Sequence, residues 1–143
     1  MMRQVAVARR QPERTEQAHV IKLYRAIGAT VFVMGTSRRK GARCPQCQAF
    51  VPNRDHGTHQ TPGIPDLFVL LPPVPRVSST PEPLFHEVKA PGGRLRPEQQ
   101  QFRAQCLDAG VLHVVGGLNA AIEFLVRTGR ARPESFPHYR VVR

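Results

Sequence analysis

Asp66, Glu87 and Lys89 are the residues whose types and spacing best suit chemistry on a phosphate. Side chains alternate along a strand, so Glu87 and Lys89 project from one face while Val88 between them turns into the core. If Asp66 begins the neighbouring strand, its carboxylate approaches that of Glu87, and such a pair is costly without a cation. Mg²⁺ takes carboxylate oxygens, keeps several waters and accepts phosphate oxygens. We therefore expect a hydrolytic metal site in which Lys89 orients a water and offsets charge on the phosphate.

An ordinary structural role is the competing interpretation of these residues. Glu87 and Lys89 would then form the solvated face of an edge strand, and Asp66 would turn the chain after Pro65. A Glu-x-Lys pattern is too short to be specific by itself. The metal site therefore depends on its combination with other motifs.

The elements that position these residues follow from hydrophobic periodicity and from Pro and Gly boundaries. Their order predicts a single α/β domain with a mixed central sheet flanked by helices, in which the second and third strands pair as a hairpin. Helices are expected at 12–27, 97–109 and 118–128, and strands at 29–34, 66–71, 84–90 and 111–115.

The chain outside these elements divides into four segments. The domain expected at 12–128 follows a flexible basic arm, 1–11, and precedes a basic tail, 129–143. Inside the domain, the periodicity stops over a basic Cys/His insertion, 35–65, and over a Pro-rich loop, 72–83.

Charge and length narrow the class of protein. The 143 residues allow one domain, and the formal charge of +11, carried almost entirely by Arg, indicates a polyanionic partner such as nucleic acid more strongly than mere solubility. No stretch reaches the roughly 20 apolar residues of a membrane span, and no secretory leader is apparent, so we expect a soluble intracellular protein without a membrane or an organic cofactor as partner. The candidate phosphate contacts are Arg38, Arg39, Lys40, Arg43, Arg94 and Arg96.

A second candidate metal site lies in the insertion. Cys44 and Cys47 are separated by two residues, and His56 and His59 follow. Two thiolates and two imidazoles suit a tetrahedral Zn²⁺ that would hold a polar segment together, with Asp55 as an alternative ligand. Free reduced cysteines remain the alternative interpretation.

Three motifs together resemble the VRR-NUC family within the PD-(D/E)XK nuclease superfamily. They are Gly63-Ile64-Pro65-Asp66, then Glu87-Val88-Lys89, then the run from Gly92-Gly93 to Pro97-Glu98-Gln99. The resemblance covers roughly residues 11 to 125 and implies a restriction-endonuclease-like α/β core. Arg96 stands before Pro97, where the family often has Ser.

The resemblance also implies roles for individual residues. Asp66, Glu87 and the Val88 carbonyl would bind Mg²⁺ or Mn²⁺, Lys89 would be the catalytic lysine, and Gln99 would assist it from its helix. The family carries an acidic residue on the first helix with Gln four residues later, which matches Glu13 and Gln17. Glu16 is a close competitor for the acidic position.

The function that the resemblance implies is a metal-dependent DNA endonuclease. Small stand-alone members suggest a homodimer that acts on branched DNA, and a phage or prophage origin in a bacterial cytoplasm. The alternative is a non-catalytic, zinc-stapled DNA-binding module. A basic RNA-binding protein is a third interpretation.

Overall fold

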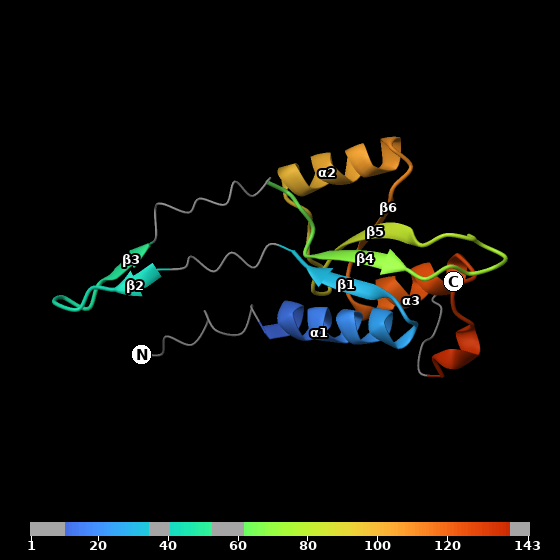
Figure 1. Cartoon of the computed structure of the whole chain (residues 1–143), viewed down its shortest axis with the longest axis horizontal. Coiled ribbons are helices and arrows are strands. Elements are labelled where there is room, and N and C mark those ends of the chain that lie inside the picture. The colour runs from blue at the N-terminus through green and yellow to red at the C-terminus, as the bar shows by residue number, and fades with distance from the viewer. Residues whose placement is uncertain (1–10, 35–40, 53–61, 138–143) are drawn as a thin grey trace.

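A four-stranded mixed sheet with helices on both faces forms the body of the protein (Figure 1). The computed structural model describes residues 11–34, 41–52 and 62–137. The elements of this body are α1 (Gln11–Ala26), β1 (Thr30–Val33), β4 (Leu67–Leu71), β5 (Glu82–Glu87), α2 (Pro97–Asp108), β6 (Leu112–Val115) and α3 (Leu118–Arg127). Every predicted helix and strand is present, and the predicted α/β class with a mixed sheet is confirmed.

The strands of this sheet lie in the order β1-β4-β5-β6. β4 pairs antiparallel with β1 and with β5, which confirms the predicted hairpin, and β5 pairs parallel with β6. Leu67 lies opposite His86 in the β4–β5 ladder. Continued by one residue, this register places Asp66 opposite Glu87.

One face of the sheet carries the main core. Alternate β4 residues, Leu67, Val69 and Leu71, are fully buried there, as period-two burial requires. Helices α1 and α3 cover this face and contact each other. They contribute the apolar side chains Val20, Leu23, Tyr24, Ala121, Ile122, Phe124 and Leu125.

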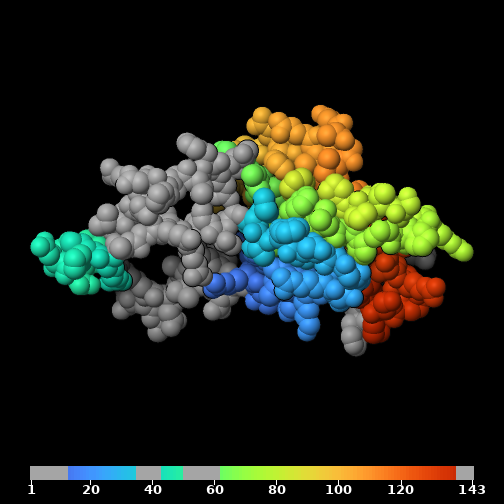
Figure 2. Space-filling model, in the orientation of Figure 1, coloured from blue at the N-terminus to red at the C-terminus, as the bar shows by residue number. Residues whose placement is uncertain are grey.

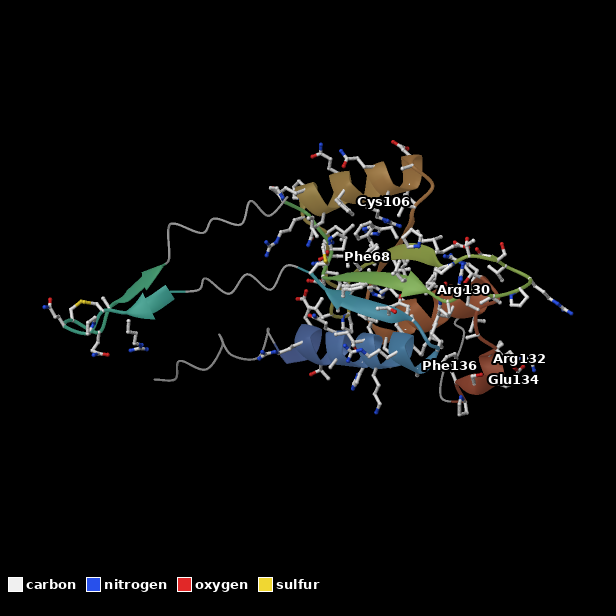
Figure 3. The ribbon with its side chains drawn as sticks, viewed as in Figure 1. Phe68, Cys106, Arg130, Arg132, Glu134 and Phe136 are labelled. Atoms are coloured by element: carbon white, nitrogen blue, oxygen red, sulfur yellow. The ribbon has the colours of Figure 1, made fainter. Side chains whose placement is uncertain are left out.

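The other face carries a row of aromatic rings that leads to α2. Phe32, Phe68, Phe85 and Phe102 follow one another with ring centroids 5.1–5.9 Å apart. Phe68 lies on the side of β4 that faces α2 (Figure 3). In the space-filling view α2 stands across the sheet from α1 (Figure 2). Phe102 therefore docks α2 on the face from which Asp66 and Glu87 project.

The insertion contains a hairpin that the sequence did not predict. Strands β2 (Gly41–Arg43) and β3 (Phe50–Pro52) pair antiparallel in a sheet of their own. Figure 1 shows this hairpin apart from the four-stranded sheet. Arg38, Arg39, Lys40, His56 and His59 lie outside the described residues.

Two other segments are more ordered than the sequence suggested. Within the Pro-rich loop, Val74 and Ser78 form a β-bridge that closes a tight turn. The predicted basic tail, 129–143, contains Arg130, whose side chain is 3% exposed and pairs with Glu82 at 2.9 Å. Figure 3 shows Arg130 at the opposite end of the molecule from the hairpin. The tail also contains a short 3-10 helix, η1 (Pro133–Ser135). Arg130 is thus a structural cation.

Candidate active site

The carboxylates of Asp66 and Glu87 meet where β4 begins and β5 ends. Asp66 precedes β4, and its Oδ2 accepts a hydrogen bond of 2.9 Å from the backbone N–H of Val88. Val88 is fully buried on the opposite face, so the chain must extend past β5 with Glu87 and Lys89 on the α2 side. The predicted strand ran to residue 90, whereas β5 ends at Glu87 and Lys89 lies just beyond it.

Lys89 is held between two acidic side chains. Its Nζ lies 2.8 Å from Glu87 Oε1 and 3.8 Å from Glu13 Oε1. The Lys89 side chain is 13% exposed, against 3% for Glu87 and 47% for Glu13. The ammonium is therefore fixed at the mouth of the site, with its alkyl chain covered.

The structure separates the two candidate acidic residues of α1. Glu13 faces Lys89, whereas Glu16 Oε2 accepts a 2.8 Å hydrogen bond from the backbone N–H of Leu118, the first residue of α3. Glu16 thus caps α3, where a carboxylate also complements the helix dipole. A Cβ at Gly117 would overlap the Glu16 carboxylate, so this cap requires glycine there. The prediction that Glu16 competes for the site is not supported. Gln17, on the same helix, is half-buried.

Gln99 links the first turn of α2 to the carboxylate pair. Its Oε1 accepts a 2.8 Å hydrogen bond from Arg96 N–H, which turns its amide N–H toward Glu87 Oε1 at 2.5 Å. The backbone of Gly63 packs directly against this turn. Its φ is +82°, and a Cβ there would overlap the backbone of Glu98, so this position requires glycine. The Gly63 motif and Gln99, 36 positions apart, are therefore packed against each other.

Burial raises the pKa of both carboxyl groups, and neighbouring negative charges add to the rise: that of Glu13 for Asp66, and those of Asp66 and Glu13 for Glu87. For Asp66 burial is the largest cause, partly offset by the Val88 N–H and by Lys89. For Glu87 burial again dominates and the charges of Asp66 and Glu13 add to it, while the bond to Lys89 opposes it. An ion that brings positive charge would relieve these costs.

The donor set fits a hard divalent cation. Glu87 Oε2 is buried and has no hydrogen-bond partner among the described residues, so one carboxylate oxygen stays available. No group of three or more His, Cys, Asp or Glu side chains in the described part of the chain is placed to hold a metal ion, so the candidate protein ligands are the two carboxylates. Two carboxylates with open positions for water and phosphate are what Mg²⁺ uses in proteins.

A buried network that the sequence did not reveal holds the Glu87–Lys89 segment. Tyr24 O–H donates to His86 Nδ1 at 2.7 Å, and His86 Nε2–H donates to Gly116 O at 2.8 Å. The same Gly116 carbonyl accepts from Lys89 N–H at 3.3 Å. Burial lowers the pKa of His86 to about 4, so the imidazole is neutral at pH 7. His86 is thus a fully buried histidine with both ring nitrogens hydrogen-bonded, and it anchors the site.

The basic candidates divide by their position. Arg94 and Arg96 are exposed beside the first turn of α2, next to Gln99. Arg43 is exposed on β2, directly before Cys44. The remaining basic candidates and both histidine candidates fall in 35–40 and 53–61, outside the described residues.

An open mixed sheet with an Asp, a Glu and a Lys at one end defines a domain of the PD-(D/E)XK nuclease class. The family model described as the VRR-NUC domain matches residues 37–116, more than half of the chain. The chain therefore belongs to the VRR-NUC family and is a nuclease-type hydrolase with DNA as its substrate class. The family also indicates a divalent metal requirement.

A solved structure titled "VRR_NUC domain" has the same fold. It superposes with a TM-score of 0.50 and 21% sequence identity, over 81% of this chain and 95% of that chain. A comparison with curated proteins gave no match. Among the described residues no helix is long and apolar enough to cross a membrane.

Proposed function

We propose that the protein is an endonuclease that uses Mg²⁺, or Mn²⁺ in its place, to hydrolyse phosphodiester bonds in DNA. Asp66 and Glu87 would hold the metal, with the Val88 carbonyl as a further ligand. When bound, the ion neutralises the carboxylates and polarises the scissile phosphate. The nuclease domain would span 12–128.

The side chains around the metal position have distinct parts in this proposal. Lys89 orients the attacking water and offsets the charge that develops on the phosphoryl oxygens. Gln99 keeps Glu87 ionised and oriented through its amide N–H. Glu13, whose Oε1 lies 3.8 Å from Lys89 Nζ, helps to position that ammonium group by electrostatic attraction.

The observation that carries the proposal is the unequal use of the two Glu87 oxygens. Oε1 is bonded by both Lys89 and Gln99, while the buried Oε2 is left without a partner. A purely structural carboxylate in a core would have both oxygens satisfied, because an unpartnered buried oxygen costs about 1–3 kcal/mol. This cost is explained when the free oxygen serves a ligand.

We propose that the exposed arginines guide DNA toward the site without reading its sequence. Arg94 and Arg96 flank Gln99 and would contact phosphates nearest the scissile bond. The insertion, with Arg38, Arg39, Lys40 and Arg43, would contact phosphates further along the strand. We also propose that the protein acts as a homodimer on branched DNA. The expected location is the cytoplasm of a bacterial or phage-infected cell.

The decisive experiment measures cleavage of linear, single-stranded, flapped and four-way-junction DNA with Mg²⁺, Mn²⁺ or EDTA. Lys89→Ala and Asp66→Asn should abolish metal-dependent cleavage while DNA binding in EDTA persists. Matched controls are Lys22→Ala and Asp108→Asn, which change exposed side chains on α1 and α2. Tight binding without cleavage under every metal would refute the nuclease and favour the non-catalytic binding module.

A further inference from the structure

The β1 edge of the four-stranded sheet exposes an aromatic ring. Phe32 is 45% exposed, and it is the one exposed Phe or Tyr among the side chains whose burial the structure describes. Helix α2 packs against β6, and in Figure 1 strands β4 and β5 lie between α2 and β1. On the same face, Phe68 and Leu70 of β4 are only half-buried. The part of this face over β1 and β4 is therefore partly open.

Two rows of side chains cross this face next to each other. Asp66 and Glu87 form the first row, since they lie opposite each other when the β4–β5 register is continued by one residue. The second row lies two residues further along β4, and its members pair across the β1–β4 and β4–β5 ladders: Phe32, Phe68 and Phe85. Two residues of a strand span roughly 6.6 Å. The aromatic row is thus the direct neighbour of the carboxylate pair.

The exposed ring is supported by the rings behind it. The centroids of Phe32 and Phe68 lie 5.9 Å apart with their planes tilted by 31°, and Phe68 lies 5.2 Å from Phe85. A side chain that its neighbours already hold loses little freedom when a ligand packs on it. Nearly half of the Phe32 surface has no protein cover. A flat apolar group can therefore extend the row at its open end.

The DNA substrate carries flat groups of this kind. Every nucleobase has a π-face, and stacking on an exposed aromatic side chain is a way in which proteins bind unpaired bases of any sequence. In a duplex each base is already stacked on its neighbours and paired, so the ring can receive only a base that is free of its partner strand. The net charge of +11 and the exposed Arg94 and Arg96 beside α2 attract the phosphates of the same strand. Charge and aromatic surface thus favour one occupant, a DNA strand.

We propose that Phe32, supported by Phe68, stacks on an unpaired base of the DNA strand whose phosphate lies at Asp66 and Glu87. This inference rests on the proposed nuclease function and extends it to the choice of substrate. Phe32 takes no part in the chemistry. It selects DNA that is unpaired beside the scissile bond, and the stacked base fixes the strand over the carboxylates.

DNA binding in EDTA tests the stacking site without any cleavage. The dissociation constants of the full-length protein are measured by fluorescence anisotropy, at one salt concentration, for single-stranded DNA and for a blunt duplex. Phe32→Ala should weaken binding of single-stranded DNA roughly 5- to 150-fold and leave duplex binding unchanged. Val33→Ala is the matched control. Val33 is 43% exposed on the same strand, but it lies opposite the buried Leu67 and so faces the other side of the sheet.

An indole at position 32 gives a direct signal of stacking. The chain contains no tryptophan, so Phe32→Trp introduces a single fluorescent indole. This variant should bind single-stranded DNA as well as the wild type does, because an indole also stacks on bases. Single-stranded DNA should quench its fluorescence in EDTA, and the duplex should not. Absence of quenching, or an equal loss of affinity for both DNAs in Phe32→Ala, would overturn the proposal.

Two further measurements separate this proposal from its neighbours. Sedimentation of the wild type and Phe32→Ala without DNA should give the same molecular mass, and a lower mass for the variant would assign the ring to an interface between copies and overturn the stacking site. Cleavage is scored separately. A wild type that cuts DNA with Mg²⁺ while Phe32→Ala binds single-stranded DNA normally would overturn the stacking site alone. A wild type that binds through Phe32 and cuts with no metal would support the stacking site and refute the nuclease alone.

Discussion

Replacement of Gln99 by Ala tests whether α2 tunes the metal site. Gln99 donates its amide N–H to Glu87 Oε1 and so stabilises the ionised carboxylate that a metal requires. Glu87 is 3% exposed, so water cannot replace the lost bond. A hydrogen bond to a charged group contributes about 1.5–3 kcal/mol. We therefore expect the Mg²⁺ concentration for half-maximal cleavage to rise roughly 10- to 150-fold, since 1.4 kcal/mol is tenfold.

The assay is a Mg²⁺ titration of the initial cleavage rate at fixed DNA concentration and constant ionic strength. Gln101→Ala is the matched control, because Gln101 is exposed on the same helix two residues away. Gln99→Ala should also shift the acidic limb of the pH–rate profile to higher pH, because the Glu87 pKa, already raised by burial, rises further. An unchanged Mg²⁺ requirement in Gln99→Ala, or an equal change in Gln101→Ala, would refute the reasoning.

Three further predictions concern stability. Burial lowers the His86 pKa to about 4, so at this histidine the unfolded chain binds more protons below pH 6.5 than the folded chain does. His86 alone should therefore cost the wild type about 3 kcal/mol of unfolding free energy as the pH falls from 6.5 to 4. Urea unfolding of His86→Gln should show a weaker pH dependence, and equal slopes would contradict this assignment. Gly63→Ala should cost more unfolding free energy than Gly92→Ala and should slow cleavage. Both glycines have a positive φ, but only a Cβ at Gly63 would overlap the backbone of Glu98. Equal losses of unfolding free energy in urea melts would exclude this packing argument. Arg130→Met should lower the free energy of unfolding by about 2 kcal/mol, which is less than for a fully buried ion pair because Glu82 is 31% exposed. Cleavage per folded molecule should not change. A loss of specific activity would place Arg130 in the active site.

Helices and strands of the main sheet were predictable because their burial follows simple periods. In β4 every second residue is buried, and α1 ends at Ala26 before Gly28, which takes a φ of +85°. β2 and β3 were not predictable, since three-residue strands carry too little alternation to stand out. The order within the Pro-rich loop depends on a single bridge between Val74 and Ser78.

The candidate site was predictable only in part, because several roles depend on tertiary contacts. Asp66, Glu87 and Lys89 meet as the strand pattern predicted. Glu13 and Glu16 are three residues apart and share one helix face, so the sequence could not separate them. The start of α3, 102 positions from Glu16, decides between them. The link from His86 to Lys89 through the Gly116 carbonyl likewise has no local signature.

The dispersed origin of the site has a consequence for the newly made chain. Glu13 comes from the first helix, Glu87 from a central strand and Gln99 from the second helix, while the Glu16 cap ties the first helix to the third. Contacts of such wide sequence separation form only after the intervening chain has been ordered, which makes them slow to form. A chain still emerging from the ribosome, or a fragment released by a protease, lacks the complete arrangement. Its DNA-cutting capacity would therefore arise only with the finished fold.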